Sequence, residues 1–284
     1  MHSLLRIIAG LHLLRLGLRM RFLRLLANPA TMPHQRLERR FFGLRYQGWL
    51  DNYIDWSVYF LGAYEREDLL FLHEYLRDRP RRVCLDVGAN TGHHSLFFAT
   101  LFHEVHAFEP YAPVIEVLRE RVRMNDLADR VQIHPFGLGA RDETLFFHAP
   151  ESANTGTGWF GRVRDAKVKH ISELPVRRGD EVLSGLGTGP VDFIKLDVEG
   201  HEVAALEGLR QTLAAHRPVI WLEWNYPGDE PMRTRLLHCL PPGYVVHTVT
   251  TNQPVLGLFN RPSGRLQAAD YGHYGNLLLV PGTY

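Results

Sequence analysis

The stretch Val83-Cys-Leu-Asp-Val-Gly-Ala-Asn-Thr-Gly92 joins a short apolar run to an acid and to a turn that carries two glycines. The residues that follow, from 95 to 102, are mostly apolar and predict a helix. A strand, a glycine turn and a helix form the nucleotide-binding start of a doubly wound α/β domain. Glycine suits this turn because the backbone must pass close to the ligand in conformations that side chains disfavour.

The spacing within this turn indicates which ligand it binds. Asp86, Gly88 and Gly92 match neither the Gly-x-Gly-x-x-Gly pattern of dinucleotide sites nor a P-loop. An acid at the end of the strand repels phosphates, but it suits a ligand with a positive amino or sulfonium group. We therefore expect S-adenosylmethionine as the cofactor, in contact with Asp86, Gly88, Gly92 and the intervening Asn90.

Three further segments read as strands that end at the same edge of the sheet. Residues 104–109 end in Glu109, which lies where a βαβ unit places the acid that binds ribose hydroxyls. Residues 130–137 predict a third strand, and its end at Gly137 should border the adenine. Residues 191–197 predict a fourth strand that ends at Asp197, in an acidic turn that opens a helix. Open α/β sheets bind ligands at the carboxyl ends of their strands, so these residues should form one site.

These motifs resemble the FkbM-type family of S-adenosylmethionine-dependent methyltransferases. The resemblance rests on residues 85–92, 108–110, 193–202 and 219–223, and it extends from about Asp55 to the C-terminus. It implies a class I methyltransferase fold, in which a doubly wound, mostly parallel sheet of seven strands ends in an antiparallel strand. It also implies O-methylation of a hydroxyl on a saccharide or secondary metabolite.

The sequence predicts two parts. Residues 1–57 form a basic, leucine-rich helical extension, and residues 58–284 form the methyltransferase domain. Between the third and fourth strands, about fifty residues with β character predict a β-hairpin insertion over the cofactor edge. We expect Trp159 in this insertion and Trp224 beyond the fifth strand to lie beside the acceptor, since aromatic faces stack on sugar rings.

Methyl transfer to a hydroxyl needs an in-line nucleophile and a group that takes its proton. The catalytic candidates are Asp197, Glu199 and His201, with His94 as a further one. Asp197 either orients or deprotonates the acceptor, or it only caps the helix that opens at Glu199. His201 is either a base kept neutral by the helix dipole or an exposed residue of the first turn.

Other interpretations of these residues stay open. The cluster Asp197, Glu199, Glu202 and Glu223 could hold Mg²⁺ or Ca²⁺ and polarise the acceptor oxygen, although the sequence favours a site without metal. A non-catalytic S-adenosylmethionine-binding module is the main alternative function. An NAD-dependent Rossmann oxidoreductase is less favoured, because the third glycine is missing and Asp86 lies at the turn.

Composition narrows the setting in which the protein works. The net charge of +1 gives no bulk attraction to nucleic acid, so we expect a small-molecule or glycan acceptor and no nucleic-acid partner. Two cysteines rule out a disulfide framework and favour the cytoplasm. The 16 histidines show no zinc-binding spacing.

Residues 1–27 carry arginines at positions 6, 15, 19, 21 and 24 and no acid. Their longest uncharged apolar run, 7–14, is far shorter than a bilayer-spanning helix. Two alternatives remain for this segment: a helix at an anionic membrane surface, or a helix packed on the protein or on the second subunit of a homodimer. We favour packing, because leucine-rich extensions commonly serve as core or dimer contacts.

Overall fold

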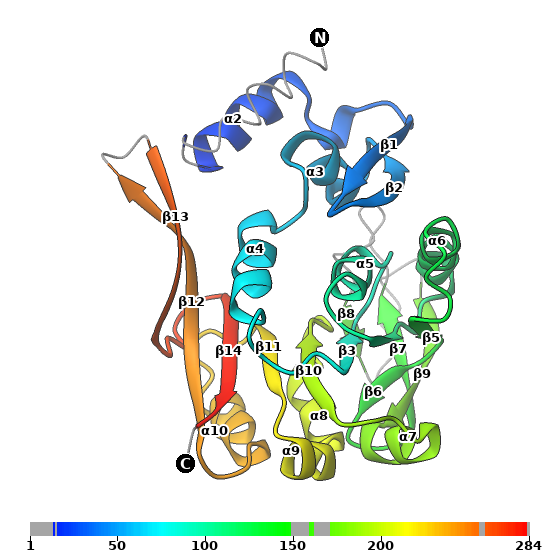
Figure 1. The fold of residues 1–284 in the computed structure, drawn as a ribbon, viewed down its shortest axis with the longest axis vertical. Helices are drawn as coiled ribbons and strands as arrows, with labels where there is room; N and C mark the ends of the chain where they lie inside the picture. Colours follow the sequence, from blue (N-terminus) through cyan, green and yellow to red (C-terminus); the bar gives the residue numbers. More distant parts are fainter. Residues whose placement is uncertain (1–13, 15, 149–158, 162–170, 256–258, 283–284) are drawn as a thin grey trace. The chain divides into compact units, whose positions relative to one another are not determined.

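The computed structural model describes residues 14, 16–148, 159–161, 171–255 and 259–282. The chain divides into two compact units (Figure 1). Unit 1 comprises residues 1–79, 152–154 and 250–265, and unit 2 comprises residues 80–151, 155–249 and 266–284. The predicted boundary between residues 57 and 58 thus falls inside unit 1.

Unit 1 contains strands as well as helices, although the sequence predicted only a helical extension. A tight turn at Phe42 and Gly43, which both have positive φ, joins two antiparallel strands into a hairpin. Asp55 fixes this hairpin from the next helix, because its carboxylate accepts hydrogen bonds from the Tyr46 hydroxyl at 2.7 Å and the Trp49 amide at 2.9 Å. The elements are α2 (Leu16–Leu26), η1 (Pro29–Thr31), β1 (Arg36–Phe41), β2 (Leu44–Trp49), α3 (Tyr53–Leu61) and α4 (Arg66–Tyr75).

Unit 2 is built on a sheet in which five neighbouring strands run parallel, in the order β11-β10-β3-β4-β5. The first and fourth predicted strands pair directly, with Lys195 beside Asp86. The short apolar runs of the sequence become these strands: β3 (Val83–Val87), β4 (Glu104–Phe108), β5 (Val131–His134), β10 (Val191–Leu196) and β11 (Val219–Trp224).

Antiparallel strands close the sheet beyond β11, as the family resemblance implied for the end of the sheet. Strand β14 (Gly275–Pro281) pairs with β11, and β12 (Tyr244–Val255) pairs with β14. Among the described residues the sheet has eight strands rather than seven, because the chain returns along β12 as β13 (Phe259–Ala268).

Helices cover both faces of the sheet, which confirms the doubly wound architecture. Ile194 and Leu196 of β10 join a buried cluster with Val203 and Leu213. The alternate residue Phe193 faces the other way and contacts Phe98, at 5.2 Å between ring centroids. The helices of this unit are α5 (His93–Ala99), α6 (Ala112–Arg123), α7 (Gly179–Leu186), α8 (Glu202–Gly208), α9 (Arg210–His216) and α10 (Glu230–Cys239).

A second, smaller sheet forms the predicted insertion. Its strands lie in the order β6-β9-β7-β8, with β6 (Gly137–Gly139), β7 (Glu143–His148), β8 (Trp159–Gly161) and β9 (Ile171–Arg178). The predicted third strand, 130–137, was therefore too long, because the chain leaves the large sheet after β5 and enters the small one at Gly137. Residues 149–158 of this insertion and the Trp159 side chain lie outside the described residues.

Within the described part of the chain, no helix is both long enough and apolar enough to cross a membrane.

Candidate active site

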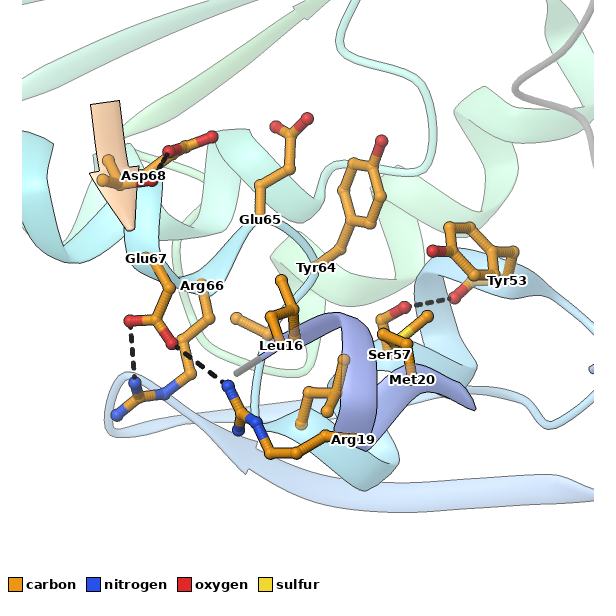
Figure 2. Close-up of a pocket in the computed structure, with 13 residues that line it drawn as sticks. Leu16, Arg19, Met20, Tyr53, Ser57, Tyr64, Glu65, Arg66, Glu67 and Asp68 are labelled. Carbon is orange, nitrogen blue, oxygen red and sulfur yellow. Dashed lines mark hydrogen bonds and ion pairs between the residues drawn. The ribbon is translucent and has the colours of Figure 1, made fainter. Parts of the chain in front are cut away.

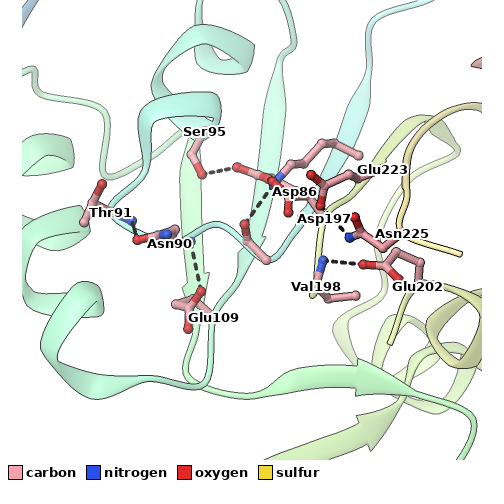
Figure 3. A network of polar contacts seen from close by, with 12 residues as sticks. Asp86, Asn90, Thr91, Ser95, Glu109, Asp197, Val198, Glu202, Glu223 and Asn225 are labelled. Carbon is pink, nitrogen blue, oxygen red and sulfur yellow. Dashed lines mark hydrogen bonds and ion pairs between the residues drawn. The ribbon is translucent and has the colours of Figure 1, made fainter. Parts of the chain in front are cut away.

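The carboxyl ends of β3, β4, β10 and β11 meet at one edge of the large sheet, and acidic residues line this edge (Figure 3). Asp86, Glu109, Asp197 and Glu223 come from these four strand ends. The structure therefore brings together the acids that the sequence assigned to one site.

Lys195 lies at the centre of this cluster, and the sequence interpretation gave it no role. Its Nζ lies 3.4 Å from Asp86 Oδ1 and 3.2 Å from Asp197 Oδ2, and it donates a hydrogen bond to the Gly88 carbonyl at 2.8 Å. Asp86 is fully buried and also accepts a hydrogen bond from the Ser95 hydroxyl at 2.5 Å. A lysine within the apolar run from Phe193 to Leu196 was the signal that could have revealed Lys195.

The turn glycines are required by packing as well as by their backbone conformation. Gly88 has a φ of +82°, and a Cβ on it would lie 1.8 Å from the Asp197 carbonyl oxygen. Gly92 has a φ of +83°, and a Cβ on it would lie 2.2 Å from Leu118 of α6. Gly88 thus lets the glycine turn approach the backbone beyond β10, while Gly92 lets α6 pack close to the start of α5.

Glu109 fastens the glycine turn to the end of β4. Its Oε2 accepts a hydrogen bond from the Asn90 amide at 2.9 Å, and its Oε1 accepts one from the Tyr111 amide at 2.8 Å. Asn90 itself has a φ of +48°, and its side chain accepts a hydrogen bond from the Thr91 amide. Burial raises the pKa of Glu109 to about 7, although the two amides oppose the rise. Each carboxylate oxygen keeps a lone pair that could accept a ribose hydroxyl.

Gly137 lies near the same edge but belongs to the small sheet. It pairs with Val176 of β9, and a Cβ on it would lie 3.8 Å from Pro110, the residue after Glu109. Its place beside Pro110 keeps it next to the predicted ribose-binding acid.

Asp197 and Glu223 form a hydrogen-bonded carboxyl pair. Burial favours protonation of both groups, but the Lys195 ammonium and the hydrogen bond from Glu223 lower the pKa of Asp197. Burial and the charge of Asp197 raise the pKa of Glu223 well above its ordinary value, while Asn225 donates to it at 2.9 Å. These opposite pKa shifts favour the proton on Glu223 and the ionised form of Asp197, whose side chain is about a third exposed (34%).

The acidic turn after β10 has its own internal support. Glu202 is fully buried and accepts hydrogen bonds from the Val198 and Gly200 amides, each at 3.1 Å, and from the Tyr226 hydroxyl at 2.9 Å. Glu199 has a φ of +50°, and partial burial together with the charges of Asp197 and Glu202 raises its pKa to about 7. The helix begins at Glu202 rather than at Glu199, and Glu202 holds the turn, which disfavours the alternative in which Asp197 only caps this helix.

The two candidate histidines lie in different places. His201 precedes α8, and its Nε2 lies 3.0 Å from where a Cβ on Gly139 would be, so its ring faces the small sheet. His94 is almost buried on α5, and its charge contributes to the lowered pKa of Asp197. Of the two histidines, His94 is thus the one that acts electrostatically on Asp197.

Trp224 was predicted to line the acceptor site, and this prediction was wrong. Its side chain is fully buried, and its indole N–H donates a hydrogen bond to the Tyr271 carbonyl at 3.2 Å. The large apolar ring gains more from packing between Tyr226 and Tyr271 than from facing the polar edge.

Metal ligands were an alternative role for these acids. Over the residues that the structure describes, no group of three or more histidines, cysteines or acids is arranged to hold a metal ion. The three hydrogen bonds to Glu202 and the pairing of Glu223 with Asp197 and Asn225 instead commit these two groups to contacts within the protein.

Comparison with known proteins agrees with the resemblance to FkbM-type methyltransferases. Residues 86–240 match the family described as Methyltransferase FkbM domain. The chain is 29% identical to the 2-O-methyltransferase NoeI of Sinorhizobium fredii in an alignment of 185 residues that covers 58% of this chain and 74% of NoeI. It is 30% identical to the hexuronic acid methyltransferase AglP of Haloferax volcanii over 139 residues, which are 49% of this chain and 54% of AglP.

Among solved structures, the methyltransferase FkbM from Methylobacillus flagellatus aligns with a TM-score of 0.44 and 17% identity, over 78% of this chain and 52% of that one. The matched region, 86–240, contains the glycine turn, Glu109, Lys195 and Asp197. The predicted enzyme class, a methyltransferase, is confirmed by the family. The chain belongs to the FkbM family of methyltransferases.

Proposed function

We propose that this protein uses S-adenosylmethionine to methylate a hydroxyl group of a saccharide, with Asp197 as the residue that accepts the hydroxyl proton. The observation that carries this proposal is the position of Lys195, which links Asp197 to Asp86 and to the Gly88 carbonyl of the glycine turn. One buried cation thereby joins the predicted cofactor loop to the predicted acceptor side.

The residues present fit this cofactor. The carboxylate of Glu109 is nearly buried, is held by two backbone amides and keeps acceptor capacity for two ribose hydroxyls. The cofactor supplies an electrophilic methyl group on a sulfonium. The glycine turn lacks the third glycine of a dinucleotide site and has the buried acid Asp86 beside it, which disfavours NAD.

Asp197 is suited to receive the acceptor hydroxyl. Because it stays ionised and partly exposed, it can accept the hydroxyl hydrogen bond and then the proton, as the oxygen bonds to the methyl carbon. Lys195 and Glu223 fix the carboxylate from two sides, so little orientation entropy is lost when the acceptor binds. A polar edge with Glu199, Glu223 and Asn225 suits an acceptor rich in hydroxyls, and AglP is named for a hexuronic acid.

The test is transfer of a radiolabelled methyl group from S-adenosylmethionine to a panel of monosaccharides and uronic acids. Label that survives alkaline hydrolysis identifies an ether on a hydroxyl, because a methyl ester on a carboxylate would be cleaved. Asp197→Asn should lower kcat by about 10²–10⁴-fold, whereas Glu207→Gln, a change in the surface ion pair with Arg235, should leave it unchanged.

The pH profile separates Asp197 from Glu199. If Asp197 takes the proton, kcat shows no acid limb near pH 7, because Asp197 stays ionised below that pH. If Glu199 takes it, kcat falls as the pH drops below about 7, and Glu199→Gln removes the activity. Cofactor binding without methylation of any hydroxyl would instead support a non-catalytic binding module. Calorimetric binding of NAD but not of S-adenosylhomocysteine would overturn the proposal.

A further inference from the structure

Helix α2 presents two different faces within unit 1. On one face, Leu23 is fully buried and Arg19 is 1% exposed, with its Nη2 3.7 Å from Glu67 Oε1 (Figure 2). The Trp56 indole holds the end of this helix by donating a hydrogen bond to the Ala27 carbonyl at 2.8 Å. The prediction that residues 1–27 pack on the protein is therefore met by one side of α2.

A second side of α2, adjacent to the buried one, leaves three large apolar side chains in solvent. Phe22 is 54% exposed, Leu25 is 78% exposed and Leu26 is 52% exposed. At 100° per residue these three side chains occupy one continuous sector of the helix surface, and Arg21 and Arg24 follow along one border of it. No acidic residue occurs in α2 or anywhere in residues 1–35.

This combination points to one kind of partner. A second copy of the chain in a symmetric dimer would present the same patch, and the patch has arginines but no acid to pair with them. An anionic bilayer offers phosphate groups for the arginines and an acyl boundary for the apolar strip. Arg19 takes no part, because Glu67 already holds it on the buried face.

We propose that α2 lies on the surface of an anionic lipid bilayer, with Phe22, Leu25 and Leu26 in the boundary between headgroups and acyl chains and with Arg21 and Arg24 among the headgroups. This arrangement is the one that interfacial amphipathic helices adopt. The helix needs no refolding to bind, because unit 1 already holds its other face.

The size of the effect follows from these side chains. One arginine near an anionic surface contributes about fivefold in affinity, so Arg21→Gln/Arg24→Gln should weaken binding by about 30-fold. Leu25→Ser removes the most exposed apolar side chain and should weaken binding by about tenfold. Arg21 and Leu25 are exposed, so their substitution should leave the thermal unfolding temperature unchanged. Arg24 is also exposed but lies over the Tyr53 ring, 5.7 Å from its centroid, so Arg24→Gln should lower that temperature only slightly, because an exposed cation–π contact contributes little to stability.

The experiment is co-sedimentation of the full chain with vesicles of neutral phosphatidylcholine, and with vesicles in which about 30% of the lipid is phosphatidylglycerol. We expect binding to the anionic vesicles, weak binding to the neutral ones, and loss of binding as salt screens the charges. Leu237→Ser, which changes an exposed leucine on α10 in unit 2, is the matched control and should bind like the wild type.

Three outcomes would overturn the proposal. The first is equal pelleting with neutral and anionic vesicles. The second is equal binding by the wild type and the Arg21→Gln/Arg24→Gln variant. The third is a dimer in light scattering that Leu25→Ser dissociates while no vesicle binding occurs, which would assign the patch to a second copy of the chain.

Discussion

Replacing Lys195 with methionine should lower the free energy of unfolding by about 3–5 kcal/mol, the usual cost of removing one partner from a buried ion pair. Lys195 is 2% exposed and Asp86 is 0% exposed, so the substitution leaves a carboxylate that water cannot reach. Ser95 then remains as its hydrogen-bond donor. Because typical domains are stable by about 5–15 kcal/mol, urea denaturation followed by tryptophan fluorescence should show a clearly lower midpoint.

A double-mutant cycle gives this prediction its control. Asp86→Asn removes the unpaired charge, so the double variant Lys195→Met/Asp86→Asn should be more stable than the sum of the two single costs implies, by about 0.5–3 kcal/mol. Arg235→Met breaks the exposed pair with Glu207, whose atoms are 2.9 Å apart, and should cost less than about 1 kcal/mol. A cost for Lys195→Met as small as that for Arg235→Met, with additive effects in the cycle, would refute the buried ion pair.

Three further predictions follow from the edge of the sheet. Glu109→Ala should weaken binding of S-adenosylhomocysteine by about 2–3 kcal/mol in calorimetry, through loss of charge-assisted bonds to two ribose hydroxyls, and unchanged affinity would place the ribose elsewhere. Because the pKa of Glu109 is about 7 and its ionised form is the better acceptor, affinity for this ligand should rise as the pH passes upward through about 7, and Glu109→Gln should flatten that dependence. Gly88→Ala should lower the thermal unfolding temperature, since its Cβ would lie 1.8 Å from the Asp197 carbonyl oxygen, whereas Gly17→Ala, with no atom within 4 Å, should not lower it.

The parallel strands and their shared edge could be predicted from the sequence because each depends on local signals. A short apolar run followed by an acid or a glycine turn marks both a strand and its carboxyl end. Once the strands are parallel, their ends must share one edge, so Asp86, Glu109 and Asp197 come together without any knowledge of side-chain contacts. The antiparallel pair β12 and β14 carried the same kind of local signal.

Features that depend on contacts between distant segments could not be predicted. The helix expected after the acidic turn at Asp197 breaks into α8 and α9 near Gly208, where a Cβ would lie 1.9 Å from the Gly139 carbonyl oxygen of β6. Strand β1 was obscured by its charges, because Arg39 lies between the inward-facing Leu37 and Phe41 and interrupts the apolar alternation. Gly139, which lies against the break in the helix, is far away in the sequence, and the strand that pairs with β1 is β2, on the other side of the turn.

Lys195 explains why the two acidic motifs of this chain act together rather than as separate sites. A buried lysine ammonium needs a negative charge nearby to offset its lost hydration. Lys195 has two such charges, Asp86 of one motif and Asp197 of the other. The same ammonium binds the Gly88 carbonyl, and Gly88 in turn has room for no side chain against the backbone of Asp197. A shift of the glycine turn would therefore alter the contacts that keep Asp197 ionised. Cofactor binding and acceptor activation are expected to be coupled through this one cation, and Lys195→Met should weaken both.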